Sequence, residues 1–303
     1  LRARNHRSER AAKGPRSLTW FDGALYSEWN HRGYIQRFEI SRILHQTKTS
    51  QQNLIVFETP MFGRVLAIDG VIQTTERDEF IYHEMLVHVP LFAHGEVRRV
   101  LIIGGGDGGA LREVLRHPGI KLARMVELDP GVIDISRQFL PGLNQGAFDD
   151  ARADLVINDG CDYVRTCGEK FDVILIDSTD PVGPGEVLFR EEFYRDCRGI
   201  LADGGILSAQ CGVPFFQAGE LTTSHQRLAS VFKDAAVYLV AIPTYVGGAM
   251  AFGLASGGPA PKSVDADTLA RRLKDAGFET RYYSPAIHRA AFALPPYIQA
   301  LLG

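Results

Sequence analysis

The sequence predicts an α/β protein with a doubly wound, mainly parallel sheet, preceded by a small antiparallel β-domain. Three observations support this fold class. The apolar run 100–103 leads directly into the glycine-rich turn 104–109, and a helix-forming segment follows. Further apolar runs alternate with helix-forming segments, as parallel strands joined by crossover helices require. The chain before residue 76 is strand-like.

The 303-residue chain has an ordinary globular composition, with 45% hydrophobic and 23% charged residues. It is long enough for a main domain and a smaller one, and no apolar run approaches the length of a membrane span. Residues 1–16 hold six Lys or Arg and one Glu, so the totals of 33 and 36 leave 27 basic and 35 acidic residues elsewhere. This acidic body argues against a nucleic-acid partner and suits a cationic ligand.

We expect three parts: a basic, disordered extension (1–17), an N-terminal β-domain (18–75) and a Rossmann-like domain (76–303). The first part lacks the apolar core of a secretory signal, and an organelle transit peptide is the alternative for its arginines. The cysteines show no CxxC spacing. We therefore expect a cytoplasmic protein with reduced thiols and no zinc site.

The strands of the N-terminal β-domain are expected at 33–40, 54–57, 65–68 and 71–73. Asp69 and Gly70 separate the last two runs, and Asp-Gly between apolar runs predicts a tight hairpin. The segment 76–89 then has acids in its first turn and an apolar stripe, which predicts a helix. Pro90 is expected to end that helix.

In the main domain, strands are expected to alternate with helices. Its strands are expected at 100–103, 126–128, 155–160, 171–177, 205–210, 236–242 and 249–255. Its helices are expected just after the glycine turn and at 130–139, 190–201, 217–232 and 265–276. In such a sheet, ligands bind at the carboxyl ends of the strands.

Acidic residues follow four successive strands. They are Asp107, Glu127, Asp159 and Asp177, with Asp180 one short turn later. Gathered at one edge of the sheet, these acids would repel one another unless a positive group lay among them. A metal would favour histidines or a compact carboxylate trio. We therefore expect an organic amine and no metal.

The glycine turn indicates a nucleotide-like ligand. Gly104, Gly105 and Gly106 let a ligand lie against bare backbone, and Glu127 is placed to accept hydrogen bonds from ribose hydroxyls. The spacing of glycines at 104, 106 and 109 also fits the dinucleotide fingerprint. These residues alone leave both NAD and adenosylmethionine-type ligands open.

Further motifs resemble the spermidine synthases, the putrescine aminopropyltransferases, in their bacterial form. These motifs are ERDEFIYHEM (76–85), GGGDGG (104–109), VELDP (126–130), NDG (158–160), DSTDPVGPGE (177–186) and IPTYVGG (242–248). The resemblance extends from about Gln36 to the segment 284–299. It implies a sheet of the adenosylmethionine-dependent transferase type and transfer of an aminopropyl group from decarboxylated S-adenosylmethionine to putrescine. Methylthioadenosine is the implied second product, and no prosthetic group is implied.

The resemblance also implies roles for individual residues. The nucleoside would be held by Gly104, Gly105, Gly106, Gln52, Glu127, Asp159, Gly160 and Pro184. Asp107 would face the aminopropyl ammonium. The polyamine would be held by His83, Asp177 and Asp180, with Tyr82, Gln210 and Tyr245 lining its site. Asp177 would be the catalytic proton acceptor.

Several alternatives stay open beside this function. They are an aminopropyltransferase with another amine acceptor, a methyltransferase, an NAD-dependent oxidoreductase and a non-catalytic polyamine-binding module. His83 stands where some family members carry glutamine, so the amine acceptor can differ from putrescine. Methyl transfer is disfavoured because Asp107 would repel the carboxylate of adenosylmethionine. The resemblance also suggests a homodimer or homotetramer, with no membrane or nucleic-acid partner.

Overall fold

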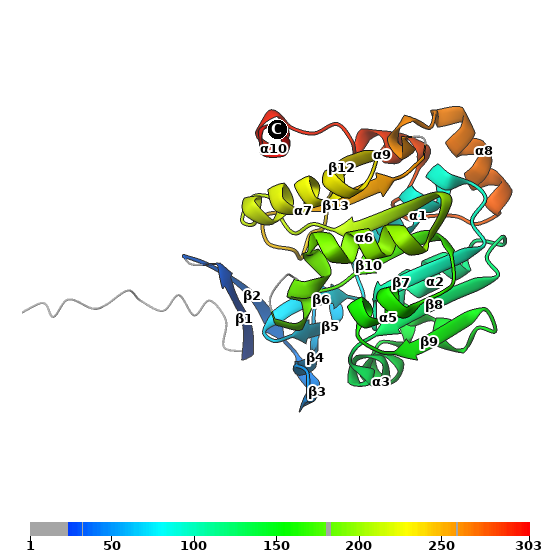
Figure 1. Ribbon diagram of the computed structural model, residues 1–303. Helices are drawn as coiled ribbons and strands as arrows, with labels where there is room; N and C mark the ends of the chain where they lie inside the picture. Colours follow the sequence, from blue (N-terminus) through cyan, green and yellow to red (C-terminus); the bar gives the residue numbers. More distant parts are fainter. Residues whose placement is uncertain (1–23, 32, 180–182, 259) are drawn as a thin grey trace, which may run out of the picture.

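The computed structural model describes residues 24–31, 33–179, 183–258 and 260–303 (Figure 1). The predicted extension 1–17 and Asp180 lie outside these ranges. Among the described residues, no helix is both long and apolar enough to cross a bilayer.

Two small antiparallel sheets precede the first helix. Their strands are β1 (Ala24–His31) with β2 (Tyr34–Ile40), and β3 (Arg42–Lys48), β4 (Asn53–Thr59), β5 (Gly63–Ile68) and β6 (Val71–Thr75) in the order β3-β4-β5-β6. Asp69 and Gly70 have φ of 48° and 90°, as a two-residue hairpin turn with two positive φ angles requires. The predicted hairpin is therefore confirmed.

The large sheet has seven strands. They are β7 (Arg99–Gly104), β8 (Leu122–Glu127), β9 (Ala153–Ile157), β10 (Phe171–Asp177), β11 (Leu201–Gln210), β12 (Asp234–Ala241) and β13 (Ala249–Ser256). Their order is β12-β13-β11-β10-β7-β8-β9, and β13 runs antiparallel to both neighbours. The chain reverses its direction across the sheet between β7 and β10, which is where doubly wound sheets bind ligands.

Helices cover both faces of the large sheet (Figure 1). The α-helices of the described residues are α1 (Glu79–His94), α2 (Gly109–Leu115), α3 (Pro130–Phe139), α4 (Pro141–Asn144), α5 (Gly160–Thr166), α6 (Glu191–Ile200), α7 (Ala218–Val231), α8 (Ala266–Ala276), α9 (Pro285–Ala290) and α10 (Pro296–Leu302). Along β7, Val100 and Ile102 join the core beneath α1 and α2, whereas Leu101 and Ile103 join the core beneath α6. This alternation confirms the predicted doubly wound α/β class.

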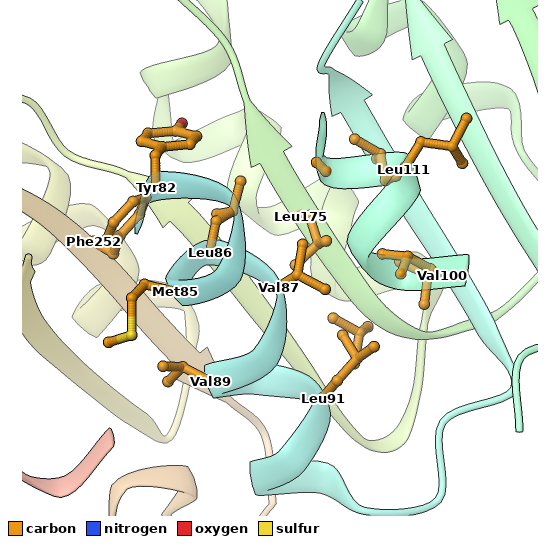
Figure 2. Packing of buried hydrophobic residues seen from close by; sticks show 14 of the residues in the cluster. Tyr82, Met85, Leu86, Val87, Val89, Leu91, Val100, Leu111, Leu175 and Phe252 are labelled. Atoms are coloured by element: carbon orange, nitrogen blue, oxygen red, sulfur yellow. The ribbon is translucent and has the colours of Figure 1, made fainter. Parts of the chain in front are cut away.

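The helix α1 lies in the core of the molecule. Figure 2 shows Leu86 and Val87 of α1 packed among residues of the sheet and of α2. Pro90 lies inside α1, which continues to His94 and ends at Gly95, so the prediction that Pro90 ends this helix was wrong. An internal proline costs about 3 kcal/mol. Burial of the turns on both sides of Pro90 offsets this cost.

The β3–β6 sheet is anchored to the main domain through α3. Leu54 of β4 and Leu66 of β5 share a hydrophobic cluster with Val132 and Ile135 of α3. Because α3 follows β8 directly, this contact holds the N-terminal sheet beside the carboxyl ends of the parallel strands. Both parts of the molecule therefore contribute residues to the same cleft.

Candidate active site

A cleft lies at the carboxyl ends of the parallel strands, between the large sheet and the N-terminal strands. Its walls include most of the predicted site residues: Gln52, Tyr82, His83, Gly104, Gly105, Gly106, Asp107, Glu127, Asp159, Gly160, Asp177, Gln210 and Tyr245. Asp180 and the side chain of Pro184 lie outside the described part of the chain. We call the part around Glu127 and Asp159 the nucleoside end, and the part around His83, Asp107 and Asp177 the amine end.

The glycine turn after β7 packs directly against the end of β10. The amide of Gly105 donates to the carbonyl of Asp177 at 2.8 Å. Gly104 has φ of 82°, and a Cβ there would lie 2.1 Å from the same carbonyl oxygen. A side chain at Gly104 would therefore separate the two strand ends that form the floor of the cleft.

At the nucleoside end, Glu127 accepts two backbone hydrogen bonds. Its Oε2 lies 3.1 Å from the amide nitrogen of Gly106, and its Oε1 lies 3.0 Å from that of Asp129. Burial raises the pKa of Glu127 to about 7 although these amides favour the ionised form. The carboxylate is thus fixed beside the bare glycine backbone.

Asp159 is fixed by a helix that the sequence analysis missed. The strand β9 ends at Ile157, so the prediction of a strand over 155–160 was wrong at its end. Asp159 is instead the N-cap of α5, and its Oδ1 accepts from the amides of Cys161 (2.8 Å) and Asp162 (3.1 Å). An aspartate at an N-cap satisfies amides that lack partners within the helix. Asp162, an acid in the first turn of α5, was the available signal for this helix start.

At the amine end, the hydroxyl of Tyr82 donates to Oδ1 of Asp177 at 2.8 Å. The other oxygen, Oδ2, is buried and has no hydrogen-bond partner among the described residues. Burial and the nearby charge of Asp107 raise the pKa of Asp177 to about 6. A carboxylate with one oxygen held and the other unpaired is suited to accept a proton.

His83 lies between two carboxylates. Its Nδ1 is 2.6 Å from Oε2 of Glu79, and its Nε2 is 3.4 Å from Oδ2 of Asp107. Burial opposes the charged ring, but Asp107 and Glu79 outweigh it and raise the pKa of His83 well above its usual value. Burial likewise opposes the ionised form of Asp107, and the charge of His83 nevertheless lowers the pKa of Asp107. The two side chains form an ion pair in which His83 is buried and Asp107 is partly exposed to the cleft.

The side chains of His83, Asp107 and Asp177 could also be considered as metal ligands, because one ligand atom from each lies within 4.8 Å of the others. A histidine must be neutral to bind a metal, whereas this ring contacts a carboxylate on each side. The carboxylates of Asp107 and Asp177 are instead suited to substrate ammonium groups. An amine ligand, as expected from the sequence, fits this geometry better than a metal ion does.

Gln210 and Tyr245 line the cleft while their polar atoms hold backbone. The amide nitrogen of the Gln210 side chain donates to the carbonyls of Ser178 and Thr179 at 3.2 and 3.1 Å. The hydroxyl of Tyr245 donates to the carbonyl of Gln73 at 2.7 Å. These contacts fix the chain after β10 and the middle of β6, and thereby the shape of the cleft.

Two family models match the chain. The spermine/spermidine synthase domain matches residues 79–266, and the spermidine synthase tetramerisation domain matches residues 24–76. The curated relatives include a polyamine aminopropyltransferase of Pectobacterium carotovorum, 52% identical over 92% of this chain and 97% of the relative. Polyamine aminopropyltransferase 1 of Pseudomonas aeruginosa is 53% identical over the same shares.

Solved structures give the same match. A spermidine synthase in complex with the transition-state analogue AdoDATO superposes with a TM-score of 0.88 at 39% identity, covering 97% of this chain and 98% of that one. The spermidine synthase of Thermotoga maritima superposes with a TM-score of 0.87 at 40% identity, covering 93% and 95%.

Proposed function

The chain belongs to the spermine/spermidine synthase family, and from this membership we propose the reaction that its cleft performs. The enzyme transfers the aminopropyl group of decarboxylated S-adenosylmethionine to putrescine and releases spermidine and methylthioadenosine. The observation that carries this proposal is the Asp177 carboxylate, which lines the cleft with one oxygen bound to Tyr82 and the other unpaired among the described residues.

The nucleoside end supports binding of the adenosyl group. Glu127 would accept hydrogen bonds from the ribose hydroxyls, because its carboxylate is fixed beside the glycine turn. Asp159 and Gly160 would hold the adenine, with Gln52 lining the same end. A Cβ at Gly160 would lie 2.6 Å from the side chain of Ile103, so the tight packing there depends on glycine.

The amine end supports binding of two ammonium groups and removal of one proton. Asp107 would face the ammonium of the aminopropyl group, and its carboxylate would repel the additional carboxylate of S-adenosylmethionine. His83 and Asp177 would position putrescine, with Tyr82 and Tyr245 on the walls. We also assign Asp180 and Pro184 to the site on the family motif, although the structure does not describe their side chains.

The proposed reaction needs no covalent enzyme intermediate. One ammonium of putrescine transfers a proton to Asp177, since an ammonium has no electron pair with which to attack. The free amine then forms a C–N bond to the aminopropyl carbon while the C–S bond breaks. The electron pair of the broken C–S bond stays on sulfur, so the sulfonium becomes the neutral thioether of methylthioadenosine. Holding both substrates in line supplies much of the rate enhancement.

Product analysis by mass spectrometry tests this function. Purified enzyme would be incubated with decarboxylated S-adenosylmethionine and, in turn, putrescine, cadaverine and spermidine, with ordinary S-adenosylmethionine as the control donor. We expect spermidine and methylthioadenosine from putrescine and no transfer from the control donor. Faster transfer to another amine would identify that amine, and not putrescine, as the preferred acceptor. Absence of product with every amine, from enzyme that still binds methylthioadenosine, would exclude the function.

We further propose that the protein is a cytoplasmic homodimer or homotetramer that associates through its N-terminal strands. The matched tetramerisation model covers these strands. Leu25, Tyr34, Ile35 and Ile43 are exposed on β1 to β3, and exposed apolar side chains on strands favour association. All four cysteines are free, as is usual in a reducing compartment. Light scattering after size-exclusion chromatography would give the oligomeric state, and a monomer would contradict this assembly.

A further inference from the structure

A buried row of charged side chains leads from the amine end into the interior. Glu79 of α1, whose Oε2 contacts His83, also accepts a two-pronged hydrogen bond from Arg112 of α2 at 3.1 and 2.9 Å. The Nε of Arg112 donates to Glu113 at 2.8 Å, and Glu113 lies 2.9 Å from His88. The row therefore connects α1 and α2 directly behind His83.

These residues lie away from solvent. Glu79 is 7% exposed, Arg112 8% and Glu113 2%. Removing charges from water costs several kcal/mol per ion, and apolar replacements of a buried ion pair are often as stable. Stability alone is therefore a weak reason for a charged pair at this place. The contact of Glu79 with His83 suggests that the pair serves the site instead.

The contact with Glu79 determines what His83 presents to the cleft. Because Nδ1 faces a carboxylate at 2.6 Å, it carries a proton, and Nε2 faces Asp107. Gly109 leaves room for this position of the ring, since a Cβ there would lie 2.2 Å from Cε1 of His83. Arg112 in turn fixes both oxygens of Glu79. The orientation and charge of His83 thus depend on Glu79, which lines the same cleft, and on Arg112, which binds Glu79 and is not among the cleft-lining residues.

We propose that Glu79 and Arg112 are positioning residues of aminopropyl transfer, which hold His83 charged and aimed at Asp107. The proposal rests on the function given above. The charge on His83 keeps the Asp107 carboxylate ionised, so that it can accept a hydrogen bond from the ammonium of the aminopropyl group. Without Glu79, the ring can turn or lose its proton, and Asp107 and Asp177 would then face each other with less compensation.

A double-mutant cycle tests whether Glu79 acts through His83. We expect Glu79→Gln to lower kcat/KM for putrescine by about tenfold or more, and by less than about threefold in a His83→Gln background. Glu84→Gln is the matched control, because Glu84 is also buried on α1 but, among the described residues, its carboxylate accepts from the backbone amides of residues 281–283. Any loss from Glu84→Gln should be the same in both backgrounds.

Equal losses from Glu79→Gln in both backgrounds would overturn the proposal. If Glu79→Gln does not fold, Glu79→Asp supplies the same comparison, because it keeps the charge but shortens the reach to His83. A loss from Glu79→Asp that is smaller in the His83→Gln background than in the wild-type background would support the proposal, and an equal loss in both backgrounds would reject it.

A second measurement does not depend on catalysis and so separates this proposal from the proposed function. Nitrogen NMR of histidine-labelled enzyme reports the protonation of His83, assigned by its loss in His83→Gln. The charged or titratable groups that lie beside this ring in the described part of the chain are Glu79 and Tyr82 on α1, Asp107 in the glycine turn and Asp177 at the end of β10, and Arg112 of α2 binds Glu79. We expect Glu79→Gln to lower the pKa of His83 by about one unit or more, and Glu84→Gln to leave it unchanged. An unchanged pKa in Glu79→Gln would overturn the proposal even if the wild type makes spermidine.

Discussion

At the nucleoside end of the cleft the carboxylates accept hydrogen bonds from backbone amides, whereas at the amine end each carboxylate has a side-chain partner, which for Asp107 adds to a hydrogen bond from the amide of Gly109. Glu127 and Asp159 are held by amides of the glycine turn and of residues next to them in the chain. Asp177 is held by Tyr82, which is 95 positions away, and Asp107 lies beside His83. The first end is fixed by backbone amides, and the second depends also on a balance of charges. Binding of the nucleoside and transfer of the proton should therefore be separable by mutation.

The largest expected effect comes from the proton acceptor. Asp177→Asn should lower kcat by about 10²- to 10⁴-fold, because an amide cannot take the proton from putrescine. The affinity for methylthioadenosine, measured by calorimetry, should stay within about twofold since the nucleoside end keeps its contacts. A parallel loss of nucleoside affinity would show that the two ends are not separable.

The converse change is at the nucleoside end. Glu127→Gln should weaken methylthioadenosine binding by about 10- to 100-fold, because hydrogen bonds to a charged acceptor are worth about 1.5–3 kcal/mol. The KM for putrescine should change little. Calorimetry and steady-state kinetics on the same preparation give both quantities, and a larger effect on the amine KM would contradict the assignment of Glu127.

Two glycines provide a matched pair of smaller changes. A Cβ at Gly109 would lie 2.2 Å from the ring of His83, and a Cβ at Gly106 would lie 2.8 Å from Oε2 of Glu127. Neither glycine has a positive φ, so alanine causes no backbone strain. We expect Gly109→Ala to raise the KM for putrescine by about tenfold, and Gly106→Ala to weaken methylthioadenosine binding by a similar factor. If both variants changed the KM for putrescine and the affinity for methylthioadenosine to the same extent, the two ends of the cleft would not be functionally distinct.

The smallest effect is a pH dependence of nucleoside binding. Glu127 has a pKa of about 7, and its ionised form is the one that we propose accepts hydrogen bonds from the ribose hydroxyls. Methylthioadenosine should bind several-fold more tightly at pH 8 than at pH 6, because the carboxylate is ionised as pH rises through 7. Calorimetry across this range should show a much flatter dependence for Glu127→Gln, and a flat wild-type profile would argue against this contact.

The same difference between the ends explains what the sequence could predict. The strand β7, the glycine turn and Glu127 belong to one short stretch of alternating elements, so the strand-end rule placed Glu127 correctly in the cleft. Asp159 was placed in the cleft as well, although α5 was missed. Its capping bonds are local, and a closer search for N-cap signals would have found this helix.

The support behind His83 could not be predicted in the same way. Glu79 and His83 are four positions apart on one helix, which is a visible pairing signal. Arg112 lies 33 positions beyond Glu79, and its contact depends on how α2 packs against α1. A single sequence gives no register for that packing. Pro90 shows the same limit, because tertiary burial of α1 overrides the local signal for a helix end.

The most direct test of the account is the pH dependence of the single-turnover rate of spermidine formation, followed by rapid quench with both substrates saturating. With a pKa of about 6 for Asp177, the wild-type rate should fall as pH drops through 6, because the protonated carboxyl cannot accept another proton. In Asp177→Asn this fall should disappear along with most of the rate. A wild-type rate that stays constant down to pH 5, or an Asp177→Asn variant with the wild-type rate and profile, would contradict Asp177 as the base.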